Sequence, residues 1–334
     1  MKTHRGYVVG VIVVGALAIG GCSEQLNMLK ARQAFKEANG AYAAKEYEVA
    51  VEKYNHVLEL DPDGDPRVIV PAFFYLGSSH HLIYRPTHKD DPENDAHLEK
   101  AIELYEKTLD ITEETNPIRQ YAYEQLGAIY RDIKDDFQVA EEYYLELIAL
   151  DVERPERYYA LGDLYERFDD PEALPLIEKA IEAYQQPVAR NPEDPVGYRH
   201  VAALLNKYGR FDETMQWQKR ARDVNPNDPE GYYIVATHYW DKVYRDPDLT
   251  NTERKEYIAL GQEELDKALE LNQQYVDALI YKNLLLREEA KIEPNARRRV
   301  ELEAQANAIR DQALEIKKAQ EEAAIAAAGA EETS

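Results

Sequence analysis

Aromatic, aliphatic and small residues recur in a fixed order along much of the chain. Around positions 123, 158, 198 and 232, a tyrosine is followed three residues later by Leu or Val and then by Gly or Ala. An earlier copy, with phenylalanine in place of tyrosine, lies at 73–77. Positions three and four apart lie on one face of a helix. The pattern therefore predicts a series of amphipathic helices.

A second pattern follows most of these segments and predicts a partner helix for each. It places an alanine four residues before a tyrosine, at 50 and 54, 101 and 105, 140 and 144, and 180 and 184. Asp61-Pro62, Asn191-Pro192 and Asn225-Pro226 are expected to end helices. Asp194-Pro195 and Asp228-Pro229 are expected to open the next helices, with Asp as the N-cap and Pro in the first turn.

Together the two patterns resemble the tetratricopeptide repeat (TPR), a helix-turn-helix unit of 34 residues, and the step from Asp194 to Asp228 has that period. The resemblance implies an all-α fold: a TPR-type helical-repeat solenoid of about six units with a C-terminal capping helix. Small residues are expected where the first helix of a unit approaches the second, at Ala38, Gly77, Gly127, Gly162, Ala202 and Ala236.

The same reading divides the chain into four segments. These are a signal peptide (1–21), a tether (22–28), the solenoid (29–292), and a C-terminal helix with an Ala/Glu-rich tail (293–334). In the sixth unit we expect an insertion from Asp246 to about Glu256. Asn295 can cap the last helix, which we expect to cover the final unit with apolar positions at Val300, Leu302, Ile309, Leu314 and Ile316.

The N-terminus combines a basic start, an apolar stretch at 8–19 and the sequence Ile19-Gly20-Gly21-Cys22. The apolar stretch has the length of a signal-peptide core and is short for a membrane span. Ile19 to Cys22 resemble the bacterial lipobox, which implies that Cys22 becomes the lipidated (palmitate-type) N-terminus of a periplasm-facing, membrane-anchored protein. By resemblance to enterobacterial lipoproteins, Ser23 rather than Asp after the cysteine implies the outer membrane. The alternative is a buried structural cysteine.

The composition of the chain excludes several classes of function. The 334 residues carry a net charge of -24, which excludes general nucleic-acid binding because the basic surface it requires is missing. With a single cysteine, the chain has neither an intramolecular disulfide nor a cysteine cluster for a metal. No nucleotide-binding or hydrolase motif is present, and the carboxylates are spread at repeat spacing. We therefore expect no enzyme activity and no cofactor.

Four histidines and three aspartates cluster in and beside the second unit. Imidazole and carboxylate groups can bind Zn, Ni or Cu. Their spacing matches no known ligand motif, so we expect a polar loop rather than a metal site. The residues are His80, His81, His88, His97, Asp90, Asp91 and Asp95.

The resemblance also implies that the first helix of each unit lines a concave surface that binds protein or peptide partners. We expect an exposed aromatic row there, because Tyr158, Tyr232 and Tyr239 already hold the core positions. The positions that carry over are Phe74, Tyr75, Ser78, Tyr121, Glu124, Arg131, Tyr159, Asp163, Glu166, Arg199, His200, Asn206, Tyr233, Thr237 and Trp240.

Three readings of this surface remain. The first is an envelope scaffold or adaptor that holds protein or peptide partners, for example in the assembly of envelope complexes. The second is an envelope protein that binds glycans or small ligands by stacking aromatic side chains on sugar rings. In the third, the C-terminal helix of the chain itself fills the groove.

Overall fold

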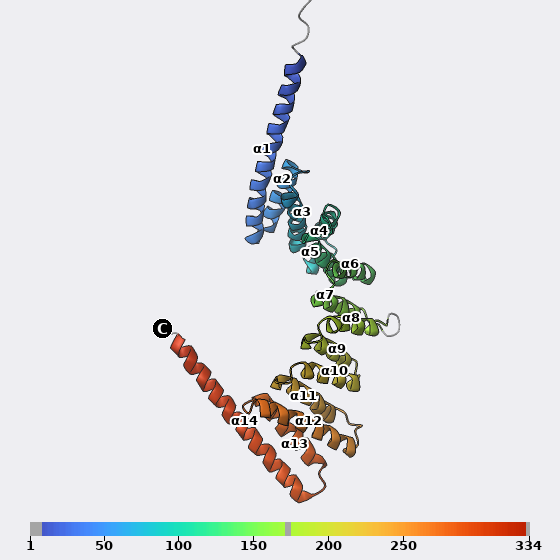
Figure 1. The fold of residues 1–334 in the computed structure, drawn as a ribbon, viewed down its shortest axis with the longest axis vertical. Coiled ribbons are helices and arrows are strands. Elements are labelled where there is room, and N and C mark those ends of the chain that lie inside the picture. Colours follow the sequence, from blue (N-terminus) through green and yellow to red (C-terminus); the bar gives the residue numbers. More distant parts are fainter. Residues whose placement is uncertain (1–8, 171–174, 332–334) are drawn as a thin grey trace, which may run out of the picture. The chain divides into compact units, whose positions relative to one another are not determined.

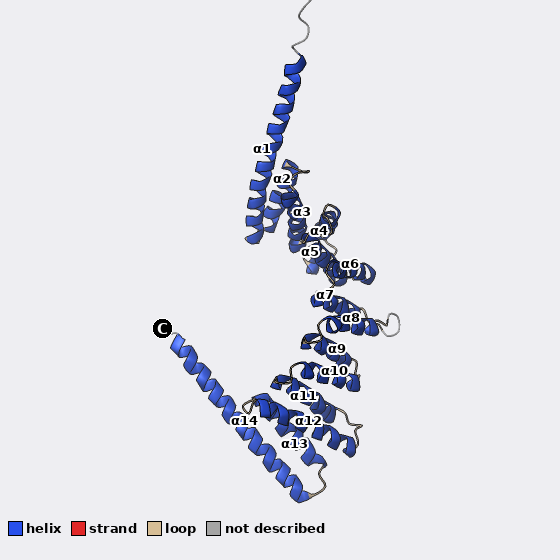
Figure 2. Cartoon of the chain, in the orientation of Figure 1, coloured by secondary structure: helices blue, strands red, loops and turns tan. Residues whose placement is uncertain are grey.

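In the computed structural model the chain forms two compact units, residues 1–176 (unit 1) and 177–334 (unit 2), each built from helices (Figures 1 and 2). The structure describes residues 9–170 and 175–331, and within these ranges the side chains of residues 25–325. The described part of unit 1 contains α1 (Val9–Ala43), α2 (Tyr47–Leu60), α3 (Pro66–Ile83), η1 (Pro86–His88), α4 (Pro92–Asp110), α5 (Ile118–Ile129), the π-helical turn η2 (Tyr130–Lys134), α6 (Phe137–Leu150) and α7 (Pro155–Arg167). The described part of unit 2 contains α8 (Ile177–Arg190), α9 (Pro195–Lys207), α10 (Phe211–Val224), α11 (Pro229–Arg245), α12 (Asn251–Leu271), α13 (Val276–Ile292) and α14 (Ala296–Glu331).

Consecutive helices pack as two-helix hairpins, and each hairpin contacts the next one within its unit. The hairpins are α1–α2, α3–α4 and α5–α6 in unit 1, and α9–α10, α11–α12 and α13–α14 in unit 2. This arrangement confirms the predicted all-α helical-repeat fold. The two helices of the fourth predicted repeat, α7 and α8, fall in different units, and residues 171–174 of its loop lie outside the described ranges.

Aspartate–proline pairs begin several helices, as predicted. Asp194 and Asp228 each accept a hydrogen bond, 3.0 Å long, from the backbone N–H two residues later. Asp65 and Asp91 do the same at α3 and α4. The carboxylate satisfies the N–H of the second helical residue, which has no partner within the helix. Proline fits the first helical position because the N–H that it lacks would have no partner there either.

Small residues set the close approach of the two helices in a hairpin. A Cβ on Gly77 would lie 3.1 Å from Leu104 Cβ, and one on Gly127 would lie 3.1 Å from the Tyr144 ring. Ala202 and Ala236, which take the equivalent place in unit 2, are fully buried. These positions have the role that the sequence predicts for them.

The cores run from hairpin to hairpin within each unit, as in other repeat arrays. In unit 1, one cluster surrounds Tyr54 and Leu76, and the next surrounds Tyr105 and Leu126. In unit 2, one cluster surrounds Ile258, and it includes side chains from α11, α12 and α13. The fully buried Tyr54 donates its hydroxyl proton to Asn39 Oδ1 at 2.6 Å, which satisfies its polar end inside the core.

Two details of the C-terminal region correct the sequence analysis. Residues 251–256, expected in an insertion, form the first turns of α12, because Thr250 and Glu253 make a capping box there. The last helix packs on α13 as the second helix of a further hairpin, through Leu302 and Ala306. The side chains of Val300 (64% exposed) and Leu314 (58% exposed) face solvent instead of the core, because only one face of α14 is covered.

The first helix runs without interruption from Val9 to Ala43, through the predicted end of the signal peptide and the 22–28 tether. The Cys22 side chain and residues 1–8 lie outside what the structure describes. In the part of the chain that was described, no helix is both long enough and sufficiently apolar to cross a bilayer.

Candidate partner-binding surface

A groove of about 570 Å³ lies on unit 1, where the first helices of three successive hairpins meet. We call it the aromatic groove. Helix α1 contributes residues from its C-terminal half, α3 residues from its first turns up to Tyr75, and α5 its first turn with the loop before it. The lining residues are Phe35, Asn39, Pro66, Arg67, Val70, Pro71, Phe74, Tyr75, Asn116, Pro117, Ile118 and Tyr121.

Three of the predicted site residues, Phe74, Tyr75 and Tyr121, lie together in this groove. The Phe74 ring centroid is 5.4 Å from that of Tyr75 and 6.2 Å from that of Tyr121. Phe74 also packs on the buried Tyr105, with centroids 5.5 Å apart. The Tyr121 side chain is 48% exposed. The groove therefore has an aromatic floor held by the core and an accessible tyrosine at its α5 side.

Some of the remaining lining residues on α3 and α5 follow from the predicted ones by helical spacing, although the sequence analysis did not name them. Val70 and Pro71 precede Phe74 by four and three residues, and Ile118 precedes Tyr121 by three. Phe35 and Asn39 are four residues apart on α1. Residues at these spacings share a helix face. Extending the predicted positions by one turn would have found Val70, Pro71 and Ile118, but not the α1 side of the groove.

Polar groups occupy the ends of the groove. Arg67 is its one charged lining residue, and its side chain is 82% exposed. Its guanidinium binds Asp65 at 2.9 Å, and Arg32 binds the same carboxylate at 2.8 Å. The hydrogen bonds from Arg67 hold the pKa of Asp65 far below its usual range. Two guanidinium groups share one carboxylate at this end of the groove.

Two asparagines line the groove with amide groups that can still donate. Asn39 accepts the Tyr54 hydroxyl with its Oδ1, and Asn116 accepts the Ile118 N–H with its Oδ1. Neither side-chain NH₂ donates to another described residue within hydrogen-bond distance. An amide NH₂ carries two donors, so both residues can bind carbonyl groups of a ligand.

The other predicted residues of unit 1 lie away from the groove lining. Arg131, in η2, forms two hydrogen bonds to Asp132 at 2.9 and 2.7 Å, and its guanidinium lies 6.0 Å from the Tyr144 ring centroid. Tyr159 and Glu166 are half-buried on α7. These three residues lie on η2 and α7, and none of them lines the groove.

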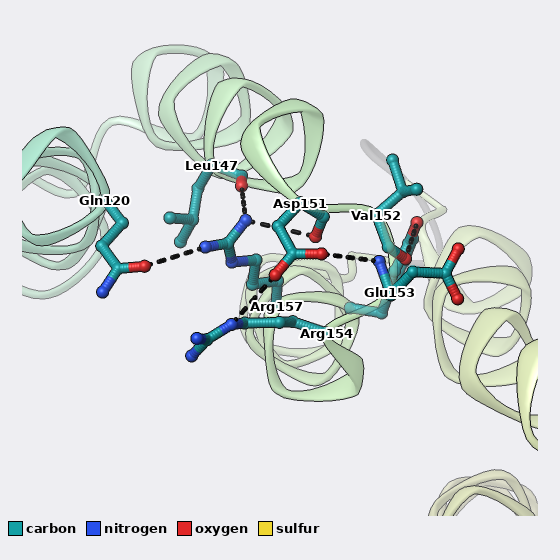
Figure 3. Close-up of polar contacts among 8 residues, drawn as sticks. Gln120, Leu147, Asp151, Val152, Glu153, Arg154 and Arg157 are labelled. Atoms are coloured by element: carbon teal, nitrogen blue, oxygen red, sulfur yellow. Dashed lines mark hydrogen bonds and ion pairs between the residues drawn. The ribbon is translucent and has the colours of Figure 1, made fainter. Parts of the chain in front are cut away.

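A buried arginine beside this surface was not found from the sequence. Arg157 donates from Nη1 to the Leu147 carbonyl at 2.6 Å and to the Asp151 carbonyl at 3.2 Å, and from Nη2 to Gln120 Oε1 at 3.2 Å (Figure 3). It thereby ties the C-terminal end of α6 to the first helices α5 and α7. Arg119 donates in the same way to the Leu109 carbonyl at the end of α4. Both arginines stand two residues after a proline, a signal that is visible in the sequence.

In unit 2 the predicted aromatic residues are packed rather than exposed. Tyr233 lies 5.3 Å from Tyr275 and 5.4 Å from Tyr281, between ring centroids. Trp240 lies 5.3 Å from Tyr281 and stacks on Tyr244 at 4.9 Å. The expected exposed row is therefore corrected here. Helix α13 places Tyr281 against both rings, and each of the two is half-buried.

The three predicted residues of α9 differ in their exposure to solvent. His200 lies 5.5 Å from Tyr184 between ring centroids, and both Arg199 and His200 are half-buried. Asn206 is exposed near the end of the helix. The alternative in which the C-terminal helix fills the groove is not supported within unit 2. There α14 packs on α13, and the two helices form a hairpin.

No protein-family profile matches the chain. Two curated proteins match part of it: the general transcriptional corepressor trfA of Dictyostelium discoideum, 31% identical over 116 residues, and the general transcriptional corepressor ssn6 of Schizosaccharomyces pombe, 28% identical over 131 residues. The matches cover 34% and 39% of this chain but only 8% and 11% of those proteins. The chain thus spans about a tenth of the length of the curated relatives it matches.

Among solved structures, the C-terminal part of a TPR repeat-containing protein from Cytophaga hutchinsonii is similar, with 14% sequence identity and a TM-score of 0.47. The similarity covers 80% of this chain and 98% of that one. At this level the function of the other protein does not transfer to the chain.

Proposed function

We propose that the protein is a non-catalytic, lipid-anchored scaffold of a bacterial cell envelope, and that the aromatic groove holds an extended segment of a partner polypeptide. The observation that carries this proposal is the groove itself. Three first helices meet at an open volume of about 570 Å³ that is lined mostly by apolar and aromatic side chains. Grooves with these properties bind apolar side chains of a ligand because binding removes both surfaces from water.

The asparagines favour a peptide over a purely apolar ligand. A peptide in extended conformation presents unpaired backbone carbonyls, which need donors when they leave water. The NH₂ groups of Asn39 and Asn116 supply such donors from α1 and from the loop before α5. An apolar bed between two amide donors suits a backbone that runs across the three helices.

Charge defines one end of the preferred ligand. Arg67 is largely exposed and is the charged side chain among the residues that line the groove. A carboxylate of the ligand at this end is attracted, whereas a lysine is repelled, although exposure and salt weaken both effects. The partner segment is therefore apolar, with an acidic residue at the end that lies over the first turn of α3.

The location rests on the N-terminal sequence. The apolar stretch at 8–19 followed by Ile19-Gly20-Gly21-Cys22 supports export and lipidation at Cys22. Attached acyl chains give stable anchoring when there is more than one of them. The net charge of -24 does not favour adhesion to anionic lipid, so the lipid would hold the protein at the membrane, with the outer membrane favoured by Ser23.

Binding can be tested with short randomised peptides displayed on phage and selected on the purified protein. We expect enriched peptides to have apolar residues followed or preceded by Asp or Glu. Fluorescence anisotropy with one enriched peptide should show weaker binding to Tyr121→Ala and unchanged binding to Tyr244→Ala. The control removes a tyrosine that is 60% exposed on unit 2.

A charge reversal sharpens the test. Arg67→Glu should reduce the preference for acidic peptides and improve binding of the same peptide with lysine in place of the acidic residue. The groove assignment is wrong if selected peptides bind Tyr121→Ala and the parent protein equally. Retention on peptidoglycan without any peptide enrichment would instead favour the glycan-binding alternative.

Anchoring is tested separately with Cys22→Ser. We expect membranes of the source bacterium to retain the parent protein and to release the variant into the soluble periplasmic fraction. Mass spectrometry of the parent protein should find acyl groups on an N-terminal Cys22. An unmodified Cys22, or a variant that stays membrane-bound, contradicts the anchor without affecting the groove.

A further inference from the structure

Two of the four clustered histidines come together across the α3–α4 hairpin. His80 on α3 and His97 on α4 are 17 residues apart in the sequence, and their Nδ1 atoms are 2.8 Å apart. The ring centroids are separated by 5.0 Å. Both side chains are half-buried, so solvent reaches the pair.

The other members of the cluster are used in local structure. Asp91 caps α4, and Asp95 accepts the Asp90 N–H at 3.1 Å. His88 lies in η1 and is exposed, and His81 packs edge-on against Tyr105 instead of facing His97. Among the described residues, no group of three or more His, Cys, Asp or Glu side chains could enclose a metal ion. Any site here therefore depends on two protein ligands.

We propose that His80 and His97 together bind a divalent transition-metal ion of the copper, nickel and zinc group, which then links α3 to α4. Two imidazole nitrogens that converge from adjacent helices are the donors these metals prefer. A small rotation of either ring opens the gap enough for both nitrogens to bind one ion at about 2.0 to 2.1 Å. Water completes the coordination from the solvent side.

Two charged side chains of opposite sign lie next to the pair on α4. Lys100 and Glu103, one and two turns further along α4, form an ion pair at 2.8 Å beside the histidines. Their charges nearly cancel, so neither strongly favours nor excludes a cation.

Without a metal, the same two nitrogens can share one proton in a hydrogen bond between neutral rings, which requires opposite tautomers. This reading assigns the pair a structural role only. The two readings differ in one respect: only the metal site predicts binding that depends on both histidines and exceeds the binding of an isolated surface histidine.

Copper is the most informative probe, because Cu²⁺ binds nitrogen ligands more tightly than Ni²⁺ or Zn²⁺ and has an electron paramagnetic resonance (EPR) signal. The full-length chain is used without an affinity tag and with Cys22→Ser in every sample, which removes the thiol. CuCl₂ is titrated by calorimetry at neutral pH. We expect one site per chain whose EPR spectrum shows two coordinated nitrogens, and a rise in melting temperature with added copper.

His97→Gln and His80→Gln should each weaken Cu²⁺ binding by at least about tenfold. Removal of a residue that only hydrogen-bonds a metal ligand already lowers metal affinity by about 10- to 100-fold. His88→Gln and His56→Gln are the controls, because both histidines are exposed and stand apart from the pair. Circular dichroism of each variant verifies that the helices are intact.

The proposal is overturned if the parent protein shows coordination by one nitrogen or none, a result that needs no variant to fold. Equal copper affinity in His97→Gln and the parent also overturns it, and leaves the hydrogen-bonded pair as the role of these residues. Zinc and nickel, titrated in the same way, should follow the order Cu²⁺ above Ni²⁺ and Zn²⁺.

Discussion

The first helices of unit 1 and unit 2 contain similar aromatic residues, which have different roles in the two units. In unit 1, Phe74 and Tyr121 stand at 6.2 Å, and the accessible Tyr121 borders an open groove. In unit 2, Tyr281 of α13 lies 5.4 Å from Tyr233 and 5.3 Å from Trp240, and a closed aromatic seam replaces the groove. Aromatic residues of the first helices thus line an open groove or pack against one another, according to what the next first helix presents to them.

The junctions between hairpins differ as well. Two residues after the proline that begins the helix, unit 1 has Arg119 and Arg157, which donate to carbonyls at the end of the preceding helix. Unit 2 has glycine at the same place. A Cβ on Gly231 would lie 3.2 Å from Arg222 Cα, so the backbones of α10 and α11 are in close approach there. Unit 1 bridges its junctions with a long side chain, and unit 2 closes one by direct contact.

The largest effect should come from Trp240→Ala in the aromatic seam. If the seam is core, the variant should lose about 3 kcal/mol of folding free energy, since Trp-to-Ala changes in packed sites cost about 3 to 5 kcal/mol. Urea unfolding, with hydrogen exchange to locate the change in α11 and α13, measures it. A loss below about 1 kcal/mol would mean that Trp240 belongs to an accessible surface, and the contrast between the units would fail.

Arg157→Ala tests the junctions of unit 1. It leaves the buried carbonyls of Leu147 and Asp151 without their donor, and we expect a loss of about 2 kcal/mol, at about 1 kcal/mol for each unpaired group. Arg154→Ala is the matched control, because Arg154 pairs with Asp151 at 3.0 Å on the exposed surface. Its loss should stay within about 0.5 kcal/mol. Equal losses in the two variants would contradict the bridging role shown in Figure 3.

Gly231→Ala tests the junction of unit 2. Alanine gains up to about 1 kcal/mol in helix propensity, but the contact with the Arg222 backbone should cost more, for a net loss of about 1 kcal/mol. Gly40→Ala in α1 is the control, since its Cβ would meet nothing within 4 Å. That change should stabilise the protein by about 0.5 to 1 kcal/mol. Stabilisation by both substitutions would show that the α10–α11 junction tolerates a side chain.

The smallest effect on stability should come from Tyr121→Ala. An accessible groove residue has little packing to lose, so we expect a change within about 0.5 kcal/mol in urea unfolding while peptide binding falls. A loss comparable to that of Trp240→Ala would show that Tyr121 is a packing residue, and the two units would then be alike.

Much of the fold could be predicted from local sequence. The alanine and glycine positions beside the aromatic residues, such as Gly77 and Gly127, lie at the helix contacts that the pattern indicated. Asp194 and Asp228 cap their helices as expected, because the carboxylate and its N–H partner are two residues apart. Such features depend on residues that are close in the chain, so a single sequence suffices to find them.

The candidate site could be predicted only in part. Phe74, Tyr75 and Tyr121 were predicted to share one surface, and in the structure they line one groove. Tyr233 and Trp240 were expected to be exposed by the same rule, but Tyr281 covers them. The anchor at Cys22 and the partner-binding role of the surface stay predictions.

By itself the sequence determined the order of the helices, their caps and the small residues at which they pair, because these follow from periodicity and near neighbours. Only the tertiary structure decided which aromatic faces stay open, which arginines reach a neighbouring helix, and that His80 meets His97. Exposure and long-range contact depend on the side chains that a second helix brings to the first, and the spacing within one helix contains no information about them.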